Sequence, residues 1–166
     1  MSRINQLISH LHLQPHPEGG FYAETYRSKE HIAQQHLPNR FNGSRNFGTA
    51  IYFLLPESTF SAFHKIESDE LWHFYEGTSL HVYVITLVGE MHVIKLGSRI
   101  EEGEVYQAVV PAGCWFASKP ANAEGYSFVG CTVAPGFDFA GFELAEREEL
   151  VQLYPEHALI IKELTR

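Results

Sequence analysis

The amino-acid sequence contains few cysteines, few basic residues and no long apolar segment. Its two cysteines are too few for a disulfide framework and suit a reducing compartment. No apolar run approaches the roughly 18 residues of a membrane-spanning helix, and no signal peptide is recognisable, so we expect a cytoplasmic protein without a membrane partner. The net charge of −8 repels phosphate backbones and no basic patch offsets it, which argues against a nucleic-acid partner.

The sequence does contain many short segments that are typical of β-strands. β-Branched and aromatic residues are frequent in these segments, and glycine or proline separates them. From residue 47 onward they are FGTAIYFLL, FSAFHKI, ELWHFYEG, HVYVITLV, MHVIKLG, VYQAVV, CWFAS and GYSFVGCTVA. With 166 residues and no internal repeat or linker, we predict one all-β domain over residues 1–166, built as a sandwich or a closed barrel.

Helical patterns occur near the two ends of the chain. MSRINQLISHLHL has apolar residues at helical spacing, with Ser2 in the capping position. ELAEREELVQLY and PEHALIIKEL predict two further short helices, the second starting at Pro155. Residues 28–46 form a polar stretch without a period, which we interpret as a functional lid or rim or as a poorly ordered loop.

Two segments resemble the two halves of the cupin signature. HKIESDELWHFYEG, from His64 to Gly77, resembles the first cupin motif, G-x5-H-x-H-x(3,4)-E-x6-G. VPAGCWFAS, from Val110 to Ser118, resembles the second motif, G-x5-P-x-G-x2-H-x3-N. The spacing of the histidine, the glutamate and the last glycine of the first motif is kept, and so is the Pro-x-Gly of the second.

Half of the cupin metal ligands are replaced in these motifs. His64 and Glu70 stand at two ligand positions, whereas Ile66 and Phe116 stand at the other two and have no lone pair to offer. A catalytic metal site needs three or more protein ligands, so we predict no metal and no other cofactor. Substitute ligands such as His73 or His81 would have to come from a face or a strand that the alternation does not favour.

The resemblance extends over nearly the whole chain. HPEGGFYAETYRS, TAIYFLL, SDELWHFYEG, VPAGCWFAS and TVAPGFDFAGFEL follow one another as in the uncharacterised cupin-5 subfamily, whose fold is similar to that of dTDP-4-dehydrorhamnose 3,5-epimerase. The resemblance implies a double-stranded β-helix, or jelly roll, flanked by an N-terminal helix and short C-terminal helices. It also implies a homodimer, and it carries no assigned reaction.

The candidate catalytic residues are His64 and Glu70. Alternation places His64 on one face of its strand with Ala62 and Ile66, and the resemblance to cupins implies that His64 and Glu70 point into the mouth of the barrel. A histidine and a carboxylate in an apolar cavity can act as a general base and its orienting partner. The alternative is a buried structural hydrogen bond.

The candidate ligand-binding residues are four aromatic and two charged side chains. Aromatic rings around a few polar groups suit a small cyclic ligand, although large aromatics also fill cores. Arginines can hold a phosphate or carboxylate, although surface ion pairs with the many acidic residues are the simpler explanation. The six candidates are Trp72, Phe74, Trp115, Phe116, Arg45 and Glu24.

Three functions are compatible with this pattern. The first is a metal-independent enzyme that binds a small polar molecule, similar to a sugar or nucleotide sugar, and performs proton transfer of epimerase or isomerase type. The second is a non-catalytic module that binds or senses a small molecule in the same cavity. The third is a metal-dependent cupin enzyme with unconventional ligands. The sequence does not choose between the first two, because both need the same pocket.

Overall fold

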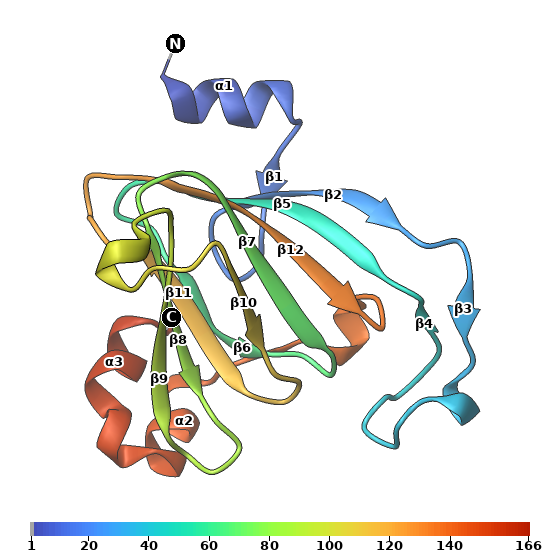
Figure 1. Cartoon of the computed structure of the whole chain (residues 1–166). Helices are drawn as coiled ribbons and strands as arrows, with labels where there is room; N and C mark the ends of the chain where they lie inside the picture. Colours follow the sequence, from blue (N-terminus) through green and yellow to red (C-terminus); the bar gives the residue numbers. More distant parts are fainter. Residues whose placement is uncertain (1) are drawn as a thin grey trace.

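Two antiparallel sheets face each other in the computed structural model, which describes residues 2–166 (Figure 1). The six-stranded sheet has the order β1-β2-β5-β12-β7-β10, and the five-stranded sheet has the order β13-β6-β11-β8-β9. The predicted all-β jelly roll is therefore confirmed. The strands are β1 (Gln14–Pro15), β2 (Phe21–Arg27), β3 (His31–Ile32), β4 (Arg45–Asn46), β5 (Thr49–Leu55), β6 (Ser61–Lys65), β7 (Asp69–Gly77), β8 (Leu80–Ile85), β9 (Met91–Leu96), β10 (Gln107–Val110), β11 (Trp115–Pro120), β12 (Ser127–Ala134) and β13 (Glu143–Leu144).

The main core lies between the two sheets. Alternation along β7 turns Glu70 and Trp72 inward and leaves Leu71 and Tyr75 on the outer surface. The inward side chains of both sheets pack together, and the largest of them are fully buried. They include Phe53, Trp72, Leu80 and Phe116.

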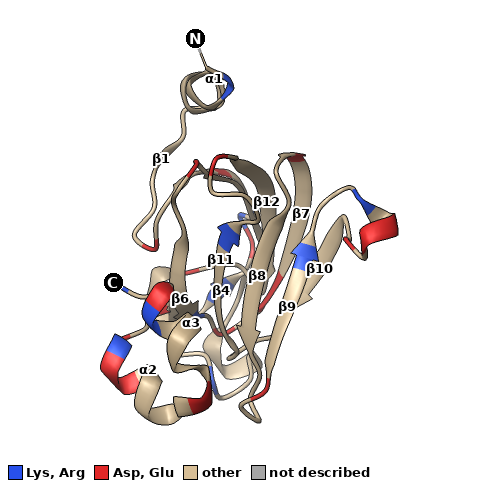
Figure 2. Ribbon diagram, turned by 90° about the vertical axis from the view of Figure 1, so that its left-hand side faces the viewer, with Lys and Arg blue, Asp and Glu red and all other residues tan. Residues whose placement is uncertain are grey.

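Helices cover part of the outer face of each sheet (Figure 1). The C-terminal helices α2 (Arg147–Leu153) and α3 (Ala158–Glu163) cover the five-stranded sheet through a second apolar cluster that includes Leu150, Ile161, Phe63 and Trp115. A single 3-10 turn begins at Pro155, and α3 follows it, so the predicted second helix starts three residues later as an α-helix. In the view of Figure 2, Lys and Arg are spread over several elements.

The N-terminal helix α1 (Arg3–His10) packs on the outside of the six-stranded sheet. The Ser2 hydroxyl accepts a hydrogen bond from the Asn5 amide at 3.3 Å, which confirms the predicted cap. Leu7 meets Leu54 and Phe128 of the sheet in a third apolar cluster. None of the helices formed by residues 2–166 is long and apolar enough to cross a membrane.

The polar stretch 28–46 is ordered by two short strands. β3 pairs with β4, and a 3-10 turn over Gln34–His36 lies between them. Arg45, one of the candidate ligand-binding residues, is buried at the end of this stretch. Its guanidinium lies 2.6 Å from the Glu67 carboxylate and 2.8 Å from the Asn42 side chain. Arg45 therefore stabilises the stretch and does not reach the cavity described below.

Candidate functional site

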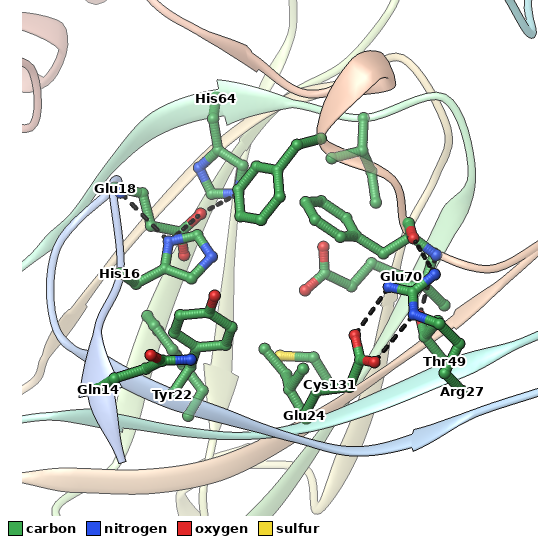
Figure 3. A pocket seen from close by; sticks show the side chains of 16 residues that line it. Gln14, His16, Glu18, Tyr22, Glu24, Arg27, Thr49, His64, Glu70 and Cys131 are labelled. Carbon is green, nitrogen blue, oxygen red and sulfur yellow. Dashed lines mark hydrogen bonds and ion pairs between the residues drawn. The ribbon is translucent and has the colours of Figure 1, made fainter.

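A cavity of about 270 Å³ lies between the two sheets. Side chains from β2, β5, β7 and β12 of one sheet and from β6 of the other form its walls. Residues 14–18, before β2, and residues 137–139, after β12, complete the lining. Figure 3 shows that its polar side chains converge on the cavity from several sides.

Glu18 and His64 form an ion pair in the cavity wall. Oε2 of Glu18 lies 3.0 Å from Nε2 of His64, and Oε1 accepts a hydrogen bond from the Ser61 hydroxyl at 2.9 Å. The other ring nitrogen of His64, Nδ1, lies 2.7 Å from the carbonyl oxygen of Ala62. A carbonyl oxygen only accepts, so Nδ1 carries a hydrogen, and Nε2 and Glu18 share a second one. Both nitrogens of His64 thus have protein partners.

The pKa shifts of Glu18 and His64 both favour the charged form of the pair. Burial opposes the charge of His64, but the attraction of Glu18, their hydrogen bond and the charge of Glu70 outweigh burial and raise the pKa of His64. Burial likewise opposes the charge of Glu18, but the charge and hydrogen bond of His64 outweigh it, with smaller help from His16 and Ser61, and lower the pKa of Glu18. Both pKa shifts therefore favour the charged forms, an imidazolium beside a carboxylate.

A glycine turn holds Glu18 in place. Gly19 and Gly20 have φ angles of +116° and +73°, in the region that favours glycine. A Cβ atom on Gly19 would lie 2.2 Å from the carbonyl oxygen of Phe60. The Glu18 carbonyl accepts a hydrogen bond from the Ala62 amide at 2.8 Å, which ties the turn to β6 beside His64.

His16 is a neutral neighbour of this pair. Its Nδ1 accepts a hydrogen bond from the backbone amide of Glu18 at 3.2 Å, so the ring hydrogen resides on Nε2. Burial lowers the pKa of His16; the attraction of Glu18 opposes this effect and the repulsion of His64 adds to it. Figure 3 shows the other ring nitrogen of His16 facing the cavity. His16 therefore offers the cavity an uncharged N–H donor.

Glu70 points into the cavity from β7, on the side opposite His16 (Figure 3). Burial raises its pKa, as does the repulsion of Glu18; the attraction of His64 and a hydrogen bond with Cys131 lower it, and the result is about 7. Burial and the charge of Glu70 raise the pKa of Cys131 well above its ordinary value, so this thiol keeps its proton. Glu70 is thus a carboxyl group that can gain or lose a proton near neutral pH.

A second ion pair, between Arg27 and Glu24, lies at the edge of the cavity. Nε and Nη2 of Arg27 donate to the two oxygens of Glu24 at 2.9 and 2.7 Å. Nη1 donates to the Asn46 side chain at 2.9 Å and to the carbonyl oxygen of Phe137 at 3.0 Å. Every nitrogen of this guanidinium therefore already has a partner in the protein.

Aromatic rings line the remaining wall. Phe137 and Phe139 meet edge to face with 4.8 Å between their centroids, and the Phe139 ring lies 6.0 Å from the His16 ring. The Tyr22 ring packs against His16 at 4.6 Å. Phe139 is 48 % exposed although it lines the cavity, which places it at the boundary between the cavity and solvent.

The residues at the cupin ligand positions do not fit a metal ion. Ile66 lines the cavity without a lone pair, and the Phe116 ring packs against the His64 ring at 4.1 Å between centroids. Both nitrogens of His64 are engaged, as described above. Within residues 2–166, no three His, Cys, Asp or Glu side chains are grouped so that they could hold a metal. The cavity lining includes neither His73 nor His81.

Three of the predicted site residues line the cavity: His64, Glu70 and Glu24. The expected pairing within this set is wrong, however. His64 is hydrogen-bonded to Glu18, whereas Glu70 acts on His64 through its charge alone. Glu70 and His64 belong to different sheets, and Glu18 reaches the space between them from its turn.

The four predicted aromatic residues lie outside the cavity lining, which corrects their assignment as ligand contacts. Trp72 and Phe116 are 1 % exposed and belong to the main core, against which Phe74 also packs. Trp115 points to the opposite face of its sheet, toward α2 and α3, where the ammonium of Lys65 lies 4.4 Å from its ring centroid. Alternation fixes the face of a strand, but not how deep along the barrel a side chain lies.

Sequence reasoning missed two polar residues that line the cavity with His64, which are His16 and Glu18. The string HPEGG contains the available signal. A carboxylate followed by two glycines, just before a strand, indicates a tight turn with one charged side chain held in a fixed direction. Only the fold reveals that this turn faces β6.

Comparisons with known proteins agree with this architecture. The family model Cupin_5, described as "Cupin superfamily (DUF985)", matches residues 5–145. The uncharacterized protein YML079W of Saccharomyces cerevisiae is 32% identical over 157 residues, which cover 89% of this chain and 78% of the yeast protein.

Solved structures are similar over the whole chain. Protein SO0799 from Shewanella oneidensis has 40% identity and a TM-score of 0.88, covering 100% of this chain and 99% of its own. A hypothetical protein from Leishmania major has 34% identity and a TM-score of 0.86, covering 97% of each chain. Oxalate decarboxylase from Bacillus subtilis has 15% identity and a TM-score of 0.53 over 90% of this chain and 36% of its own, which shows the shared fold alone.

Proposed function

The chain belongs to the cupin superfamily, in the family described as DUF985, and we propose that its cavity binds a small polar molecule and catalyses proton transfer of epimerase or isomerase type on it. The ligand class is that of a sugar or nucleotide sugar, in keeping with the resemblance to dTDP-4-dehydrorhamnose 3,5-epimerase. The reaction is metal-independent. We further propose that the protein works in the cytoplasm as a homodimer.

One observation carries the proposal. An uncharged N–H of His16 and the carboxyl group of Glu70 face the same cavity from opposite sides (Figure 3), and the pKa of Glu70 is about 7. A general acid or base works best when its pKa lies near the working pH. A neutral imidazole has one N–H group, which can donate a hydrogen bond to a carbonyl oxygen. These two groups suit proton abstraction from a carbon next to a carbonyl.

The reaction would run in two balanced steps. The Glu70 carboxylate takes the proton from the carbon next to the carbonyl, and the electron pair of the broken C–H bond forms a C=C bond. The carbonyl oxygen, hydrogen-bonded by His16, takes up the negative charge and becomes an enol or enolate. An epimerisation is completed when the same carbon takes a proton from water on its other face, the carbonyl re-forms, and Glu70 releases the first proton to solvent. An isomerisation is completed when Glu70 returns its proton to the former carbonyl carbon; the hydroxyl group on the neighbouring carbon then loses its proton and becomes the new carbonyl, and the former carbonyl oxygen takes up a proton and becomes a hydroxyl group.

The Glu18–His64 pair would then act as a positioning device. Glu18 holds both His64 and His16, through its carboxylate and through its backbone amide, respectively. The nitrogens of His64 are engaged, so His64 would influence the reaction through its charge, which favours the ionised form of Glu70. The same engagement of His64 favours the second candidate function, a non-catalytic binding or sensing module, in which no residue acts as a base.

Exchange of substrate hydrogens with deuterium tests the proposal. The protein is incubated in D2O with free hexoses, their phosphates and nucleoside-diphosphate hexoses, and the C–H signals are followed by NMR. We expect loss of one C–H signal next to the carbonyl, abolished by Glu70→Gln and reduced by His16→Phe. Glu90→Gln is the matched control, because its carboxylate is 70% exposed and lies outside the cavity. Ligand binding without exchange in the wild type would favour the binding module.

A further inference from the structure

We infer that the cavity selects a neutral polyhydroxylated carbonyl compound of the size of a free monosaccharide, and that it discriminates against phosphorylated and nucleotide-linked forms. Three carboxyl groups, those of Glu18, Glu24 and Glu70, line the cavity, and the described lining contains no unpaired cation beside them. The inference rests on the proposed function and narrows its ligand class: of sugars and nucleotide sugars, it keeps only the free sugars for the same cavity.

Each cationic group of the cavity lining forms an ion pair with a carboxylate of the same lining. His64 is matched by Glu18 at 3.0 Å, and Arg27 is matched by Glu24 through two hydrogen bonds. Among the described residues that line the cavity there is no lysine and no further arginine. Glu70 adds a third carboxyl group. A phosphate in this cavity would therefore meet carboxylates without gaining a free cation.

Arg27 is the group that an anionic ligand would have to recruit. Its remaining nitrogen, Nη1, is held by Asn46 and by the Phe137 carbonyl, and so the whole guanidinium is anchored. Separating it from Glu24 would leave the Glu24 carboxylate unpaired beside the incoming anion. The side chains of Arg27 and Glu24 are 35% and 39% exposed, so this is not a buried ion pair. An anion that displaced Glu24 would replace one anionic partner of Arg27 by another and would leave Glu24 as an unpaired like charge beside it, so recruiting Arg27 brings the anion no net gain.

Hydroxyl groups, by contrast, find partners without disturbing either pair. A carboxylate has about four lone-pair directions, and Arg27 occupies two of those on Glu24. Tyr22 and Gln14 also line the cavity, and they add a hydroxyl group and an amide group to the hydrogen-bonding groups of its wall. Acceptors on Glu24 and Glu70 and donors on Tyr22 and Gln14 suit a ligand with several hydroxyl groups.

The size and the apolar part of the cavity fit the same ligand class. Its 270 Å³ lies just below the range of about 300–1,000 Å³ that drug-sized ligands occupy. Phe137 and Phe139 also line the cavity, and the C–H face of a sugar ring can pack against aromatic rings of this kind. A nucleotide would have to extend beyond Phe139 into solvent, where none of the described lining residues offers a free cation for its phosphates.

Competitive binding measured by ligand-observed NMR tests the inference. The probes are free aldohexoses and ketohexoses, the corresponding 6-phosphates and a nucleoside-diphosphate hexose. We expect at least one free hexose to bind about tenfold or more tightly than its own phosphate, because like charges face each other in the phosphate complex. Glu24→Gln, which releases Arg27, should narrow this gap, whereas Glu90→Gln should leave it unchanged.

The outcomes separate this inference from the proposed function. Equal or tighter binding of the phosphates or the nucleotide sugar by the wild-type protein would overturn the inference, and deuterium exchange on those anions would leave proton transfer standing. Preferential binding of a free hexose without any exchange would support the inference and sink the catalytic proposal. Absence of binding by all three probe classes would overturn both.

Discussion

The carboxylate of Glu18 lies 3.0 Å from the imidazole of His64, although one residue belongs to an N-terminal turn and the other to a strand of the five-stranded sheet. Both side chains are buried, with 8% and 3% of their surface exposed. Breaking a buried ion pair by removing one partner leaves an uncompensated charge. The pair therefore connects the electrostatics of the cavity to the stability of the fold.

The first prediction concerns this pair. Glu18→Gln should destabilise the protein by about 3–5 kcal/mol, because the His64 imidazolium loses its partner. The His64 pKa is raised above 6.5, so the contribution of His64 is present below 6.5 and is lost as the pH rises through its folded value. The Glu18 pKa is lowered below 4.5, so its contribution is lost as the pH falls. The difference between variant and wild type, measured by denaturant unfolding, should be largest between these limits.

The second prediction concerns Glu70. Its pKa of about 7 exceeds the ordinary value of 4.5, so the folded state binds a proton more tightly than the unfolded state. The associated stability is present below pH 4.5 and is lost as the pH rises through 7. Glu70→Gln should therefore stabilise the protein at pH 8 to 9 by up to about 3 kcal/mol, at about 1.4 kcal/mol per pKa unit. Equal melting temperatures of variant and wild type across this range would contradict the assignment.

The third prediction concerns the turn that carries Glu18. Gly19→Ala should cost several kcal/mol of stability, because the added Cβ would overlap the Phe60 carbonyl oxygen. Gly103→Ala is the matched control: its φ is +79° and nothing lies within 4 Å of the added atom, so only about 1–2 kcal/mol of backbone strain is expected. Thermal melting compares the two. Equal losses would show that the close approach at Gly19 is unimportant.

The fourth prediction is that the purified protein contains no stoichiometric transition metal. It rests on Ile66 and Phe116 at the positions where ligands would be required, and on the engagement of both His64 nitrogens. Elemental analysis of protein prepared without chelator provides the measurement. About one zinc, iron, manganese or nickel per chain would refute the prediction.

The fifth prediction is a two-fold homodimer in solution. β9 and β10 are edge strands of their sheets, and they expose Val93 and Val109, which are 46% and 49% accessible. Pairing between subunits would protect such edges. Light scattering at micromolar concentration should give twice the mass of one chain, and a monomer mass would disprove the prediction.

The fold was more predictable from the sequence than the site. TAIYFLL is rich in β-forming residues, ELWHFYEG alternates between buried and more exposed residues, and turn residues bound both strands, so local patterns locate them. The cupin motif likewise placed His64 and Glu70 in the cavity wall. These features depend on spacing within one segment, which a sequence displays directly.

The partner of His64 depends on contacts between distant segments. Glu18 meets His64 because a glycine turn packs on β6, and no local period records that contact. Burial depth is similarly invisible: Trp72 shares a face with Glu70, yet it lies in the core and not in the cavity. Alternation tells which side chains of a strand face the interior of the barrel. It does not tell which of these line the cavity, because the cavity occupies only part of the interior.

The segment from residue 14 to residue 27 supplies a wall of the cavity although it precedes most of the barrel. Loosening of this segment would open the cavity to solvent while the strands behind it remained paired. A molecule bound between Tyr22 and Glu70 would contact this segment and keep the cavity closed. Because such a ligand binds only the closed form, its binding free energy would stabilise the segment against opening. Amide hydrogens of β2 should then exchange more slowly with solvent when a ligand is present, whereas those of β8 and β9 should be unaffected. Slower exchange in the segment from residue 14 to residue 27 would therefore show that the cavity is occupied, even for a ligand that has not been identified.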